Sequence, residues 1–398
     1  MNITIHPHRL QGEVSAIPSK SHAHRLLICA AFADKNTVLT CPETNRDILA
    51  TISCLRSLGA DITQTGKKIT VIPVKSIPES AVLDCGESGS TLRFLLPIVG
   101  ALGVHGKFLL SGRLPQRPLS PLWEELERMG CQLSRPENAV VECAGALQAG
   151  NYIIPGDVSS QYISGLLLAM PLLSGESRLT VTGKTESAPY VVMTQNAMRQ
   201  FGVESDGYRI APGSRYHSPG AVTVEGDWSN AAFFLTARAL GNELHISGLQ
   251  DDSSQGDKMI IKFLSEMDRN PVINLADTPD LAPILAVAAA AGNGARFTNI
   301  ARLRLKESDR VDSIAEMIRS LGGTVSVTET EMEIKPCTLR GGTVDARSDH
   351  RIAMSAAIAA TVACGDVTII GADCVSKSYP SFWNLYRMLG GQYEQCIQ

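Results

Sequence analysis

Apolar helical segments and short β-rich segments alternate along the chain in a fixed order. Six times, a cluster of small polar residues leads directly into an apolar, Ala/Leu-rich segment with a helical pattern. These openings read IPSKSHAHRLLICAAF, DCGESGSTLRFLLPIVGAL, GDVSSQYISGLLLAMPLL, EGDWSNAAFFLTARAL, DTPDLAPILAVAAAAG and SDHRIAMSAAIAATVAC. Each is followed by a short β-rich run, such as NTVLTCP or DVTIIG. A helix that is apolar on all sides is typical of a buried position, so the pattern predicts six buried helices, each leading to a strand.

A second, more amphipathic helix follows each strand and ends repeatedly on the same kind of stop. The stops read LRSLGADI, LERMGCQL, MRQFGVES, MIRSLGGTV and LYRMLGGQY, while the fourth copy, FLSEMDRN, is degenerate. Glycine after the last helical residue supplies a left-handed C-cap, and the small polar clusters supply N-caps. The repeating unit is therefore β-α-β-α-β-β, about 65 to 70 residues long, and six copies account for the chain. This predicts an α/β fold.

Composition narrows the class of protein. The 398 residues, 44% of them hydrophobic, suggest two or more domains, and a net charge of -4 gives no sign of a nucleic-acid partner. No apolar signal core lies within residues 1–14, and no uncharged run is long enough for a membrane helix. The ten cysteines form no C-x-x-C pair and no histidine spacing that suggests a metal, so we expect reduced, partly buried thiols of a cytoplasmic protein.

The candidate chemistry lies at the openings of the apolar helices. A helix N-terminus offers unpaired N–H groups and the positive end of the helix dipole, which together suit phosphate or carboxylate. The first three openings carry Lys20, Ser21 and Arg25; Gly89, Ser90, Thr91 and Arg93; and Ser159, Ser160 and Gln161. N-capping alone explains any one of them. Three openings that bear cations or paired serines favour anion binding, because hydroxyls and basic side chains satisfy phosphate oxygens.

Further basic residues stand where helical packing does not require them. These are Arg117, Lys306, Arg310, Arg351 and Lys377. Each alone is explained as a solvated charge, but as a set on an acidic chain they predict a local positive cleft.

Two acids complete the set. Asp280 stands at the fifth opening, where either it or Asp277 can cap the helix. Glu307 lies in the stretch LKESDR, between Lys306 and Arg310, where neighbouring charges can shift its pKa in either direction. A carboxylate beside cations at an anion site is a candidate general acid or base.

The motifs resemble those of the 5-enolpyruvylshikimate-3-phosphate synthase family. PSKSHAHR, ESGSTLRF, QRP, DVSSQ, SAPY, EGDWS, PDLAP, LKESDR, DHRIAM and KSYP occur in the order found in that family, from about residue 5 to residue 385. The resemblance implies a two-lobed, inside-out α/β barrel with three β-α-β-α-β-β repeats and pseudo-threefold symmetry in each lobe. It implies a discontinuous lobe, 1–18 plus 226–398, with the catalytic acids and the contacts to the phosphoenolpyruvate carboxylate. A contiguous lobe, 19–225, would hold shikimate 3-phosphate and the phosphate contacts.

The implied reaction transfers the enolpyruvyl group of phosphoenolpyruvate to the 5-hydroxyl of shikimate 3-phosphate and releases phosphate. It proceeds by addition and elimination through a tetrahedral intermediate, on the route to chorismate and the aromatic amino acids. Both substrates carry a phosphate and a carboxylate, which accounts for the cations and helix openings. Closing lobes would supply the charge stabilisation without a metal or cofactor. The family resemblance also implies a monomer with these small molecules, and no nucleic acid or membrane, as partners.

The resemblance assigns roles to individual residues. Shikimate 3-phosphate would contact Lys20, Ser21, Arg25, Ser159, Ser160, Gln161, Ser187, Asp280 and Lys306, with Tyr190 beside its ring. Phosphoenolpyruvate would contact Lys20, Gly89, Arg117, Gln161, Arg310, Arg351 and Lys377. Asp280 would remove the 5-hydroxyl proton, and Glu307 would protonate the methylene carbon, with Lys20 as a rival donor.

The chain departs from the family at some positions. Ala188 stands where many relatives have lysine, so a contact to the 3-phosphate is missing or is supplied elsewhere. Arg302 stands where many have asparagine, and no role is carried over to it. His22 and His24 are unusual neighbours of Lys20 in the first predicted helix. Either packing toward the lobe interior or a role in proton transfer explains them.

Three other readings remain. The related transferase that acts on UDP-N-acetylglucosamine carries a cysteine about five residues before the position of Arg117, and this chain has none there. A noncatalytic phosphometabolite-binding scaffold would keep the cations but could lose Asp280 or Glu307. The RNA-terminal phosphate cyclase architecture uses similar repeats but should show a basic surface, whereas this chain is acidic.

Overall fold

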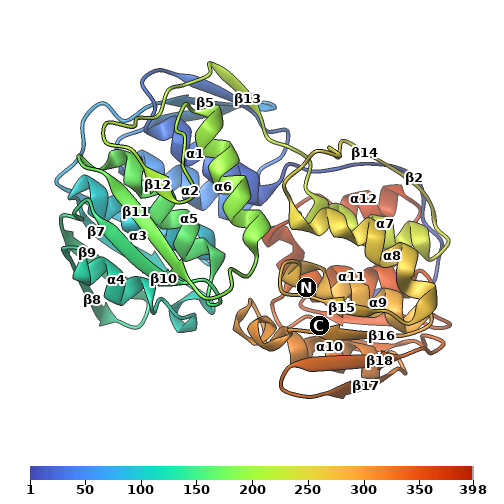
Figure 1. Ribbon diagram of the computed structural model, residues 1–398. Coiled ribbons are helices and arrows are strands. Elements are labelled where there is room, and N and C mark those ends of the chain that lie inside the picture. Colours follow the sequence, from blue (N-terminus) through green and yellow to red (C-terminus); the bar gives the residue numbers. More distant parts are fainter. Residues whose placement is uncertain (397–398) are drawn as a thin grey trace. The chain divides into compact units, whose positions relative to one another are not determined.

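The chain forms two compact units, which we describe separately. The computed structural model describes residues 1–396. The discontinuous unit comprises Met1–Ile17 and Gly226–Gln398, and the contiguous unit comprises Pro18–Glu225 (Figure 1).

Helices and strands alternate throughout the contiguous unit. Its elements are α1 (Lys20–Ala31), β3 (Thr37–Thr40), α2 (Arg46–Ser57), β4 (Asp61–Thr65), β5 (Lys68–Ile72), β6 (Ser80–Gly86), α3 (Gly89–Leu102), β7 (His105–Leu110), η1 (Leu114–Gln116), α4 (Leu122–Arg128), β8 (Cys131–Glu137), β9 (Val140–Gly145), β10 (Asn151–Pro155), α5 (Ser160–Ala169), η2 (Met170–Leu172), β11 (Ser177–Thr182), α6 (Ala188–Gln200), β12 (Arg209–Ile210) and β13 (Ala221–Thr223).

The discontinuous unit follows the same alternation. Its elements are β1 (Asn2–His6), β2 (Gln11–Ser15), α7 (Trp228–Ala239), β14 (Glu243–Ser247), η3 (Gly256–Met259), α8 (Ile260–Glu266), η4 (Met267–Arg269), β15 (Val272–Asn274), η5 (Pro279–Leu281), α9 (Ala282–Ala291), β16 (Ala295–Thr298), η6 (Ala301–Leu305), α10 (Arg310–Ser320), β17 (Thr324–Val327), β18 (Glu331–Lys335), β19 (Gly342–Asp345), α11 (His350–Ala360), β20 (Val367–Ile370), η7 (Ala372–Lys377), α12 (Phe382–Met388) and β21 (Gln392–Cys396).

The sheets repeat one plan in both units. Within the described residues, each unit has three sheets, and five of the six sheets join a parallel pair to antiparallel strands. Thus β6 pairs with β7 in parallel, and β9 and β8 follow antiparallel; β15, β16, β18 and β17 do the same. The remaining sheet is the parallel pair β14 and β2. The predicted α/β class and its repeat are confirmed.

The N-terminal strand completes a sheet made from the C-terminal part of the chain. Strand β1 lies between β20 and β21, antiparallel to both, with Ile3 opposite Ile369 on one side and Gln395 on the other. The alternating burial of β1 places Ile3 and Ile5 in the core. These pairings, with that of β2 and β14, include residues 1–17 in the discontinuous unit.

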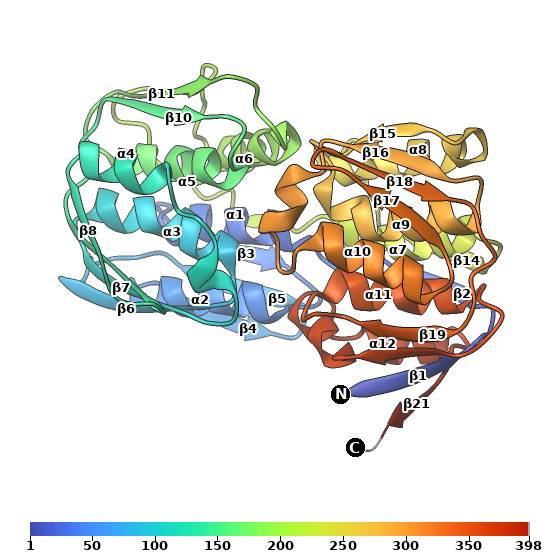
Figure 2. The same cartoon turned by 90° about the horizontal axis from the view of Figure 1, so that it is seen from below.

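The six apolar helices form the interior of their units. Helices α1, α3 and α5 in one unit, and α7, α9 and α11 in the other, are buried along most of their length, and sheets lie outside them (Figure 2). The five glycine stops all have positive φ, between +76° and +109°, as the predicted left-handed caps require. Each stop therefore turns the chain from an outer helix into the next strand.

The contact between α3 and α5 depends on a missing side chain. A Cβ on Gly165 would lie 2.2 Å from the Arg93 carbonyl oxygen and 3.2 Å from Pro97 Cγ. Residue 97 is a proline inside α3, so it cannot donate the usual helical hydrogen bond to that carbonyl. The Arg93 carbonyl oxygen instead faces Gly165, and the two helices approach closely.

We expect Gly165→Ala to lower the free energy of unfolding by about 2 kcal/mol, because overpacking against a backbone carbonyl outweighs the gain in helix propensity. Urea unfolding measures this. Gly365→Ala is the matched control, since its Cβ would meet nothing closer than 3.4 Å. Equal stability of the two variants would contradict the close approach.

Candidate functional site

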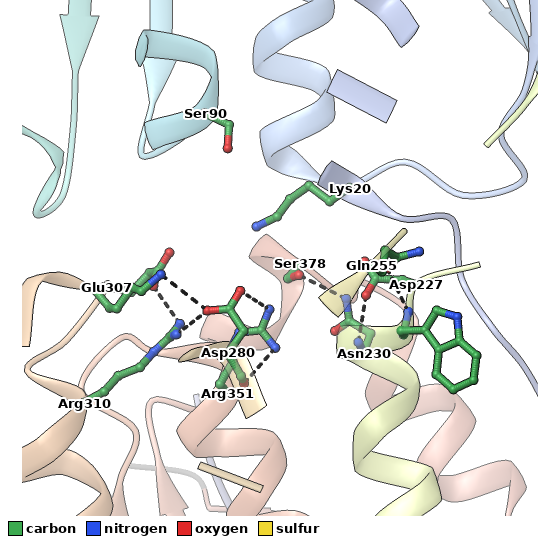
Figure 3. Close-up of polar contacts among 12 residues, drawn as sticks. Lys20, Ser90, Asp227, Asn230, Gln255, Asp280, Glu307, Arg310, Arg351 and Ser378 are labelled. Carbon is green, nitrogen blue, oxygen red and sulfur yellow. Dashed lines mark hydrogen bonds and ion pairs between the residues drawn. The ribbon is translucent and has the colours of Figure 1, made fainter. Parts of the chain in front are cut away.

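A buried arginine holds three carboxylates together in the discontinuous unit. The Arg310 side chain is 1% exposed, and it donates from Nη1 to Asp280 Oδ1 at 2.6 Å and from Nη2 to Glu307 Oε2 at 2.7 Å (Figure 3). Its Nε donates to Asp349 Oδ2 at 2.8 Å. Burial alone would lower the pKa of the guanidinium, but the three acids raise it well above its ordinary value. The group is therefore a fixed positive charge.

Asp280 lies next to three cations. Arg351 Nη2 donates to its Oδ2 at 3.0 Å, and the Lys306 ammonium lies 3.7 Å from Oδ1. Burial favours the neutral carboxyl, yet the charges of Arg351, Lys306 and Arg310 hold the pKa of Asp280 well below its usual value. Its side chain makes no capping hydrogen bond at η5 or α9. Asp280 is thus ionised.

Lys306 has an unusual proton affinity. Burial lowers the pKa of its ammonium from 10.5 to about 8, helped by Arg310 and Arg302 and opposed by Asp280. A lysine with this pKa exchanges its proton near neutral pH and still supplies a positive charge below it.

Local capping explains how the sequence positions this cluster. Asp309 caps α10 by accepting from the N–H groups of Val311 and Asp312, which places Arg310 at the first helical position. Asp349 caps α11 by accepting from the Arg351 N–H, and its other oxygen also accepts from Ser308 Oγ at 3.0 Å. Within LKESDR, Asp309 therefore caps the helix, while Lys306 and Arg310 lie next to Asp280. Glu307 accepts from Arg310.

A second cluster gathers three predicted residues in the contiguous unit. Gly89 opens α3, and a Cβ there would lie 2.5 Å from Arg93 Nη1 and 2.8 Å from Arg117 Nη1, so both guanidiniums lie against its bare backbone. Gln161 Oε1 accepts from Arg93 Nη1 at 3.0 Å, and its Nε2 donates to Ser90 Oγ at 3.0 Å. Basic groups and a helix N-terminus without a Cβ form a site suited to a phosphate.

Two cations at the start of α1 have hydrogen-bond or ion-pair partners within the contiguous unit. Lys20 Nζ lies 2.8 Å from Asp47 Oδ2 on α2. Arg25 is 2% exposed, and four of its five N–H groups donate to Thr194 Oγ1, Ser164 Oγ and the carbonyls of Ser21 and Tyr190. The remaining N–H, on Nη1, makes no hydrogen bond within residues 1–396.

The predicted serines lie at one edge of one sheet. Strands β10 and β11 are parallel, so the segments after them lie at the same edge, and Glu186 N donates to the Gly156 carbonyl across it. Ser159 and Ser160 follow β10, while Ser187 follows β11 with φ of +55°. This left-handed conformation is costly for serine and marks a constrained position.

The other predicted positions are placed individually. Lys377 ends η7 and is 8% exposed, next to Ser378, whose hydroxyl accepts from Asn230 Nδ2 at 3.5 Å. His22 and His24 are buried, and burial lowers the pKa of His22 to about 4 and that of His24 to about 3, so both are neutral. Sequence reasoning missed Asp47 and Asp349 as partners of site cations. Only the position of Asp349 before Arg351 hinted at its role.

Residues 1–396 contain neither a candidate membrane span nor a candidate metal cluster. No helix in that range is long and apolar enough to cross a membrane, and no group of three or more histidine, cysteine or acidic side chains is arranged to hold a metal ion.

We expect the Lys306 amine to become reactive with a midpoint near pH 8. The rate of acylation by an amine-specific reagent, followed at Lys306 by mass spectrometry, measures it. In Asp280→Asn the midpoint should fall further, because the carboxylate charge that favours the ammonium is removed. A midpoint near the ordinary value of 10.5 would contradict this environment.

The whole chain is similar to proteins of one family. It matches the family described as EPSP synthase (3-phosphoshikimate 1-carboxyvinyltransferase) over residues 5–385. Relatives named 3-phosphoshikimate 1-carboxyvinyltransferase from Clostridium botulinum and Clostridium perfringens are 37% and 38% identical over 423 and 416 residues, each covering 98% of both chains. The structure of EPSP synthase from Acinetobacter baumannii, 24% identical, has a TM-score of 0.81 and covers 99% of this chain and 100% of that one, which supports the fold.

Proposed function

The chain belongs to the EPSP synthase (3-phosphoshikimate 1-carboxyvinyltransferase) family, and we propose that it transfers the enolpyruvyl group of phosphoenolpyruvate to the 5-hydroxyl of shikimate 3-phosphate. The observation that carries the proposal is the ionised Asp280 carboxylate, held by Arg310 and Arg351 beside the Lys306 ammonium. A noncatalytic scaffold has no need of an acid kept ionised among three cations.

The proposed reaction has two stages that balance in protons. In the first, Asp280 accepts the 5-hydroxyl proton as the oxygen attacks C2 of phosphoenolpyruvate, and Glu307 donates a proton to the methylene carbon, with Lys20 as the rival donor. A tetrahedral ketal results. In the second, the group that donated to the methylene carbon takes a proton back from the new methyl group as the C–O bond to phosphate breaks. Asp280 would give its proton to the departing phosphate, and the enol ether and inorganic phosphate are released.

The proposed phosphate contacts are assigned residue by residue. In the contiguous unit, Ser159, Ser160 and Ser187 would hold the 3-phosphate, and Gly89, Arg117 and Gln161 the phosphate of phosphoenolpyruvate. Lys377 is also proposed to contact the phosphate of phosphoenolpyruvate. The support is the serine edge and the guanidinium pair at the α3 opening.

Arg310 and Arg351 would bind the phosphoenolpyruvate carboxylate. Arg310 uses three of its five N–H groups on the acids, so two are left for a substrate oxygen. Ser21, Arg25 and Lys306 would contact the shikimate moiety. Water exclusion on binding would strengthen each of these ionic contacts.

We further propose that the protein works as a monomer in the cytoplasm. The cysteines of residues 1–396 are all free thiols, as a reducing compartment allows, and six of the ten are buried. Light scattering of the purified protein tests the oligomeric state, and a dimer would contradict it.

The proposed activity is tested by release of inorganic phosphate. We expect release only when shikimate 3-phosphate and phosphoenolpyruvate are both present, with mass spectrometry showing the enolpyruvyl ether. Incubation with phosphoenolpyruvate and UDP-N-acetylglucosamine is the parallel reaction. Turnover of that pair alone would reverse the assignment, and turnover of neither would support a scaffold.

We expect Asp280→Asn to lower kcat by about 10²- to 10⁴-fold, the range typical of a lost general base. The substitution keeps the size of the side chain and removes its charge and proton affinity. The exposed neighbour Asp277→Asn is the matched control and should keep kcat within about threefold, since surface changes are mild. An Asp280→Asn enzyme as active as this control would refute the role of the carboxylate.

A further inference from the structure

A chain of buried hydrogen bonds links the first two helix openings of the contiguous unit. His24 Nδ1 lies 2.7 Å from Thr51 Oγ1, which lies 2.7 Å from Thr91 Oγ1, which donates to Ser88 Oγ at 2.7 Å. His24, Thr51 and Thr91 are 0% exposed, and Ser88 is 1% exposed. The four side chains come from α1, α2, α3 and the cap of α3, so the chain crosses the interior of the unit.

The number of protons available fixes which atom donates in each of these hydrogen bonds. A threonine hydroxyl has one proton, and that of Thr91 goes to Ser88. Thr91 must therefore accept from Thr51, whose only proton is then used, so His24 must donate from Nδ1. The other ring nitrogen, Nε2, is buried without a hydrogen-bond partner among the described residues, as an unprotonated nitrogen tolerates better than an N–H.

Both ends of the chain reach residues to which the proposed function gives ligands. Ser88 caps α3 and immediately precedes Gly89 and Ser90, while His24 immediately precedes Arg25. Thr51 lies one turn after Asp47 on α2, and His24 lies one turn after Lys20 on α1. The same two helix faces are therefore joined twice, by the Asp47–Lys20 ion pair and by the Thr51–His24 hydrogen bond.

We propose that Thr51 and Thr91 are positioning residues, which fix the opening of α3 against α1 and thereby set the affinity for phosphoenolpyruvate. This inference rests on the proposed function. The opening of α1 has other anchors, namely the Lys20–Asp47 pair and the hydrogen bonds of Arg25. Breaking the chain should therefore displace Gly89 and Ser90 more than it displaces the groups proposed to bind shikimate 3-phosphate.

Thr51→Val tests this with little change of shape. It replaces with a methyl group the hydroxyl that makes two of the three hydrogen bonds, to His24 and to Thr91. We expect the KM for phosphoenolpyruvate to rise about tenfold, from two lost hydrogen bonds. The KM for shikimate 3-phosphate and kcat should change by less than about threefold, a split that general loosening of the fold would not produce. Thr51→Ser keeps the hydroxyl and should restore the KM for phosphoenolpyruvate.

Thr236→Val is the matched control. Thr236 is a fully buried helical threonine of the other unit, on α7, and its hydroxyl has no hydrogen-bond partner among the described residues. Its loss should leave all kinetic constants unchanged. If thermal unfolding shows that Thr51→Val does not fold, the pair Thr91→Val and Thr91→Ser interrupts and restores the same chain.

Three kinetic outcomes are distinguishable. Selective loss of phosphoenolpyruvate affinity with rescue by serine supports the proposal. Unchanged KM values, or equal losses for both substrates without rescue, overturn it while the activity of the unmodified enzyme still stands. Failure of the unmodified protein to turn over either substrate refutes the proposed function and with it the affinity claim.

The direction of the chain has its own measurement, independent of activity. In two-bond ¹H–¹⁵N spectra of protein with labelled histidine, His24 should be the neutral tautomer protonated on Nδ1, identified by its absence in His24→Asn. It should not titrate between about pH 6 and pH 8, because burial lowers its pKa to about 3. A proton on Nε2 would overturn the chain as described.

Discussion

The arrangement of the discontinuous unit depends on keeping one guanidinium out of water. Removing Arg310 from solvent costs several kcal/mol unless its donors are met by well-placed partners, and breaking such a pair leaves an uncompensated buried charge. Asp280, Glu307 and Asp349 meet that demand from three separate segments, so a single cation fixes η5, the turn before α10 and the start of α11 relative to one another. The same contacts keep Asp280 ionised. The ionised state of Asp280 is thus a by-product of how this unit satisfies a buried charge, and the same cations make its carboxylate a weaker base than a free aspartate.

The two units use different caps at their helix openings. In the contiguous unit, α1, α3 and α5 are capped by Ser19, Ser88 and Ser159, and in the discontinuous unit α7, α10 and α11 are capped by Asp227, Asp309 and Asp349. A neutral cap satisfies an N–H group and leaves the positive end of the dipole to attract anions, whereas an aspartate cancels it and can orient a nearby cation. Phosphates therefore suit the first unit, and proton transfer between acids and cations suits the second.

Sequence reasoning found what repeats locally and missed what depends on distant partners. The period of six Ala/Leu-rich helices and five glycine stops predicted the α/β class, because burial and left-handed caps leave a mark within a few residues. The family resemblance alone implied that the N-terminal strand belongs to the lobe completed by the C-terminal half. Its place between β20 and β21 was not predicted, because nothing in Asn2–His6 specifies partners more than 360 residues away. Asp280 was recognised as a candidate from its position at a helix opening, and Glu307 from its charged neighbours in the sequence. Asp47, Asp349 and Thr51 were not, because their role exists only through side chains brought near by folding.

The position of β1 has a consequence for synthesis on the ribosome. The strands of the contiguous unit all pair among residues 18–225, so that unit has all its parts long before the chain is finished. Strand β1 is translated more than 360 residues before its neighbours β20 and β21, a delay on the order of tens of seconds at ordinary elongation rates. Until those two strands have been made, Ile3 and Ile5 lack the partners that bury them in the folded unit, and exposed apolar segments of this kind favour aggregation.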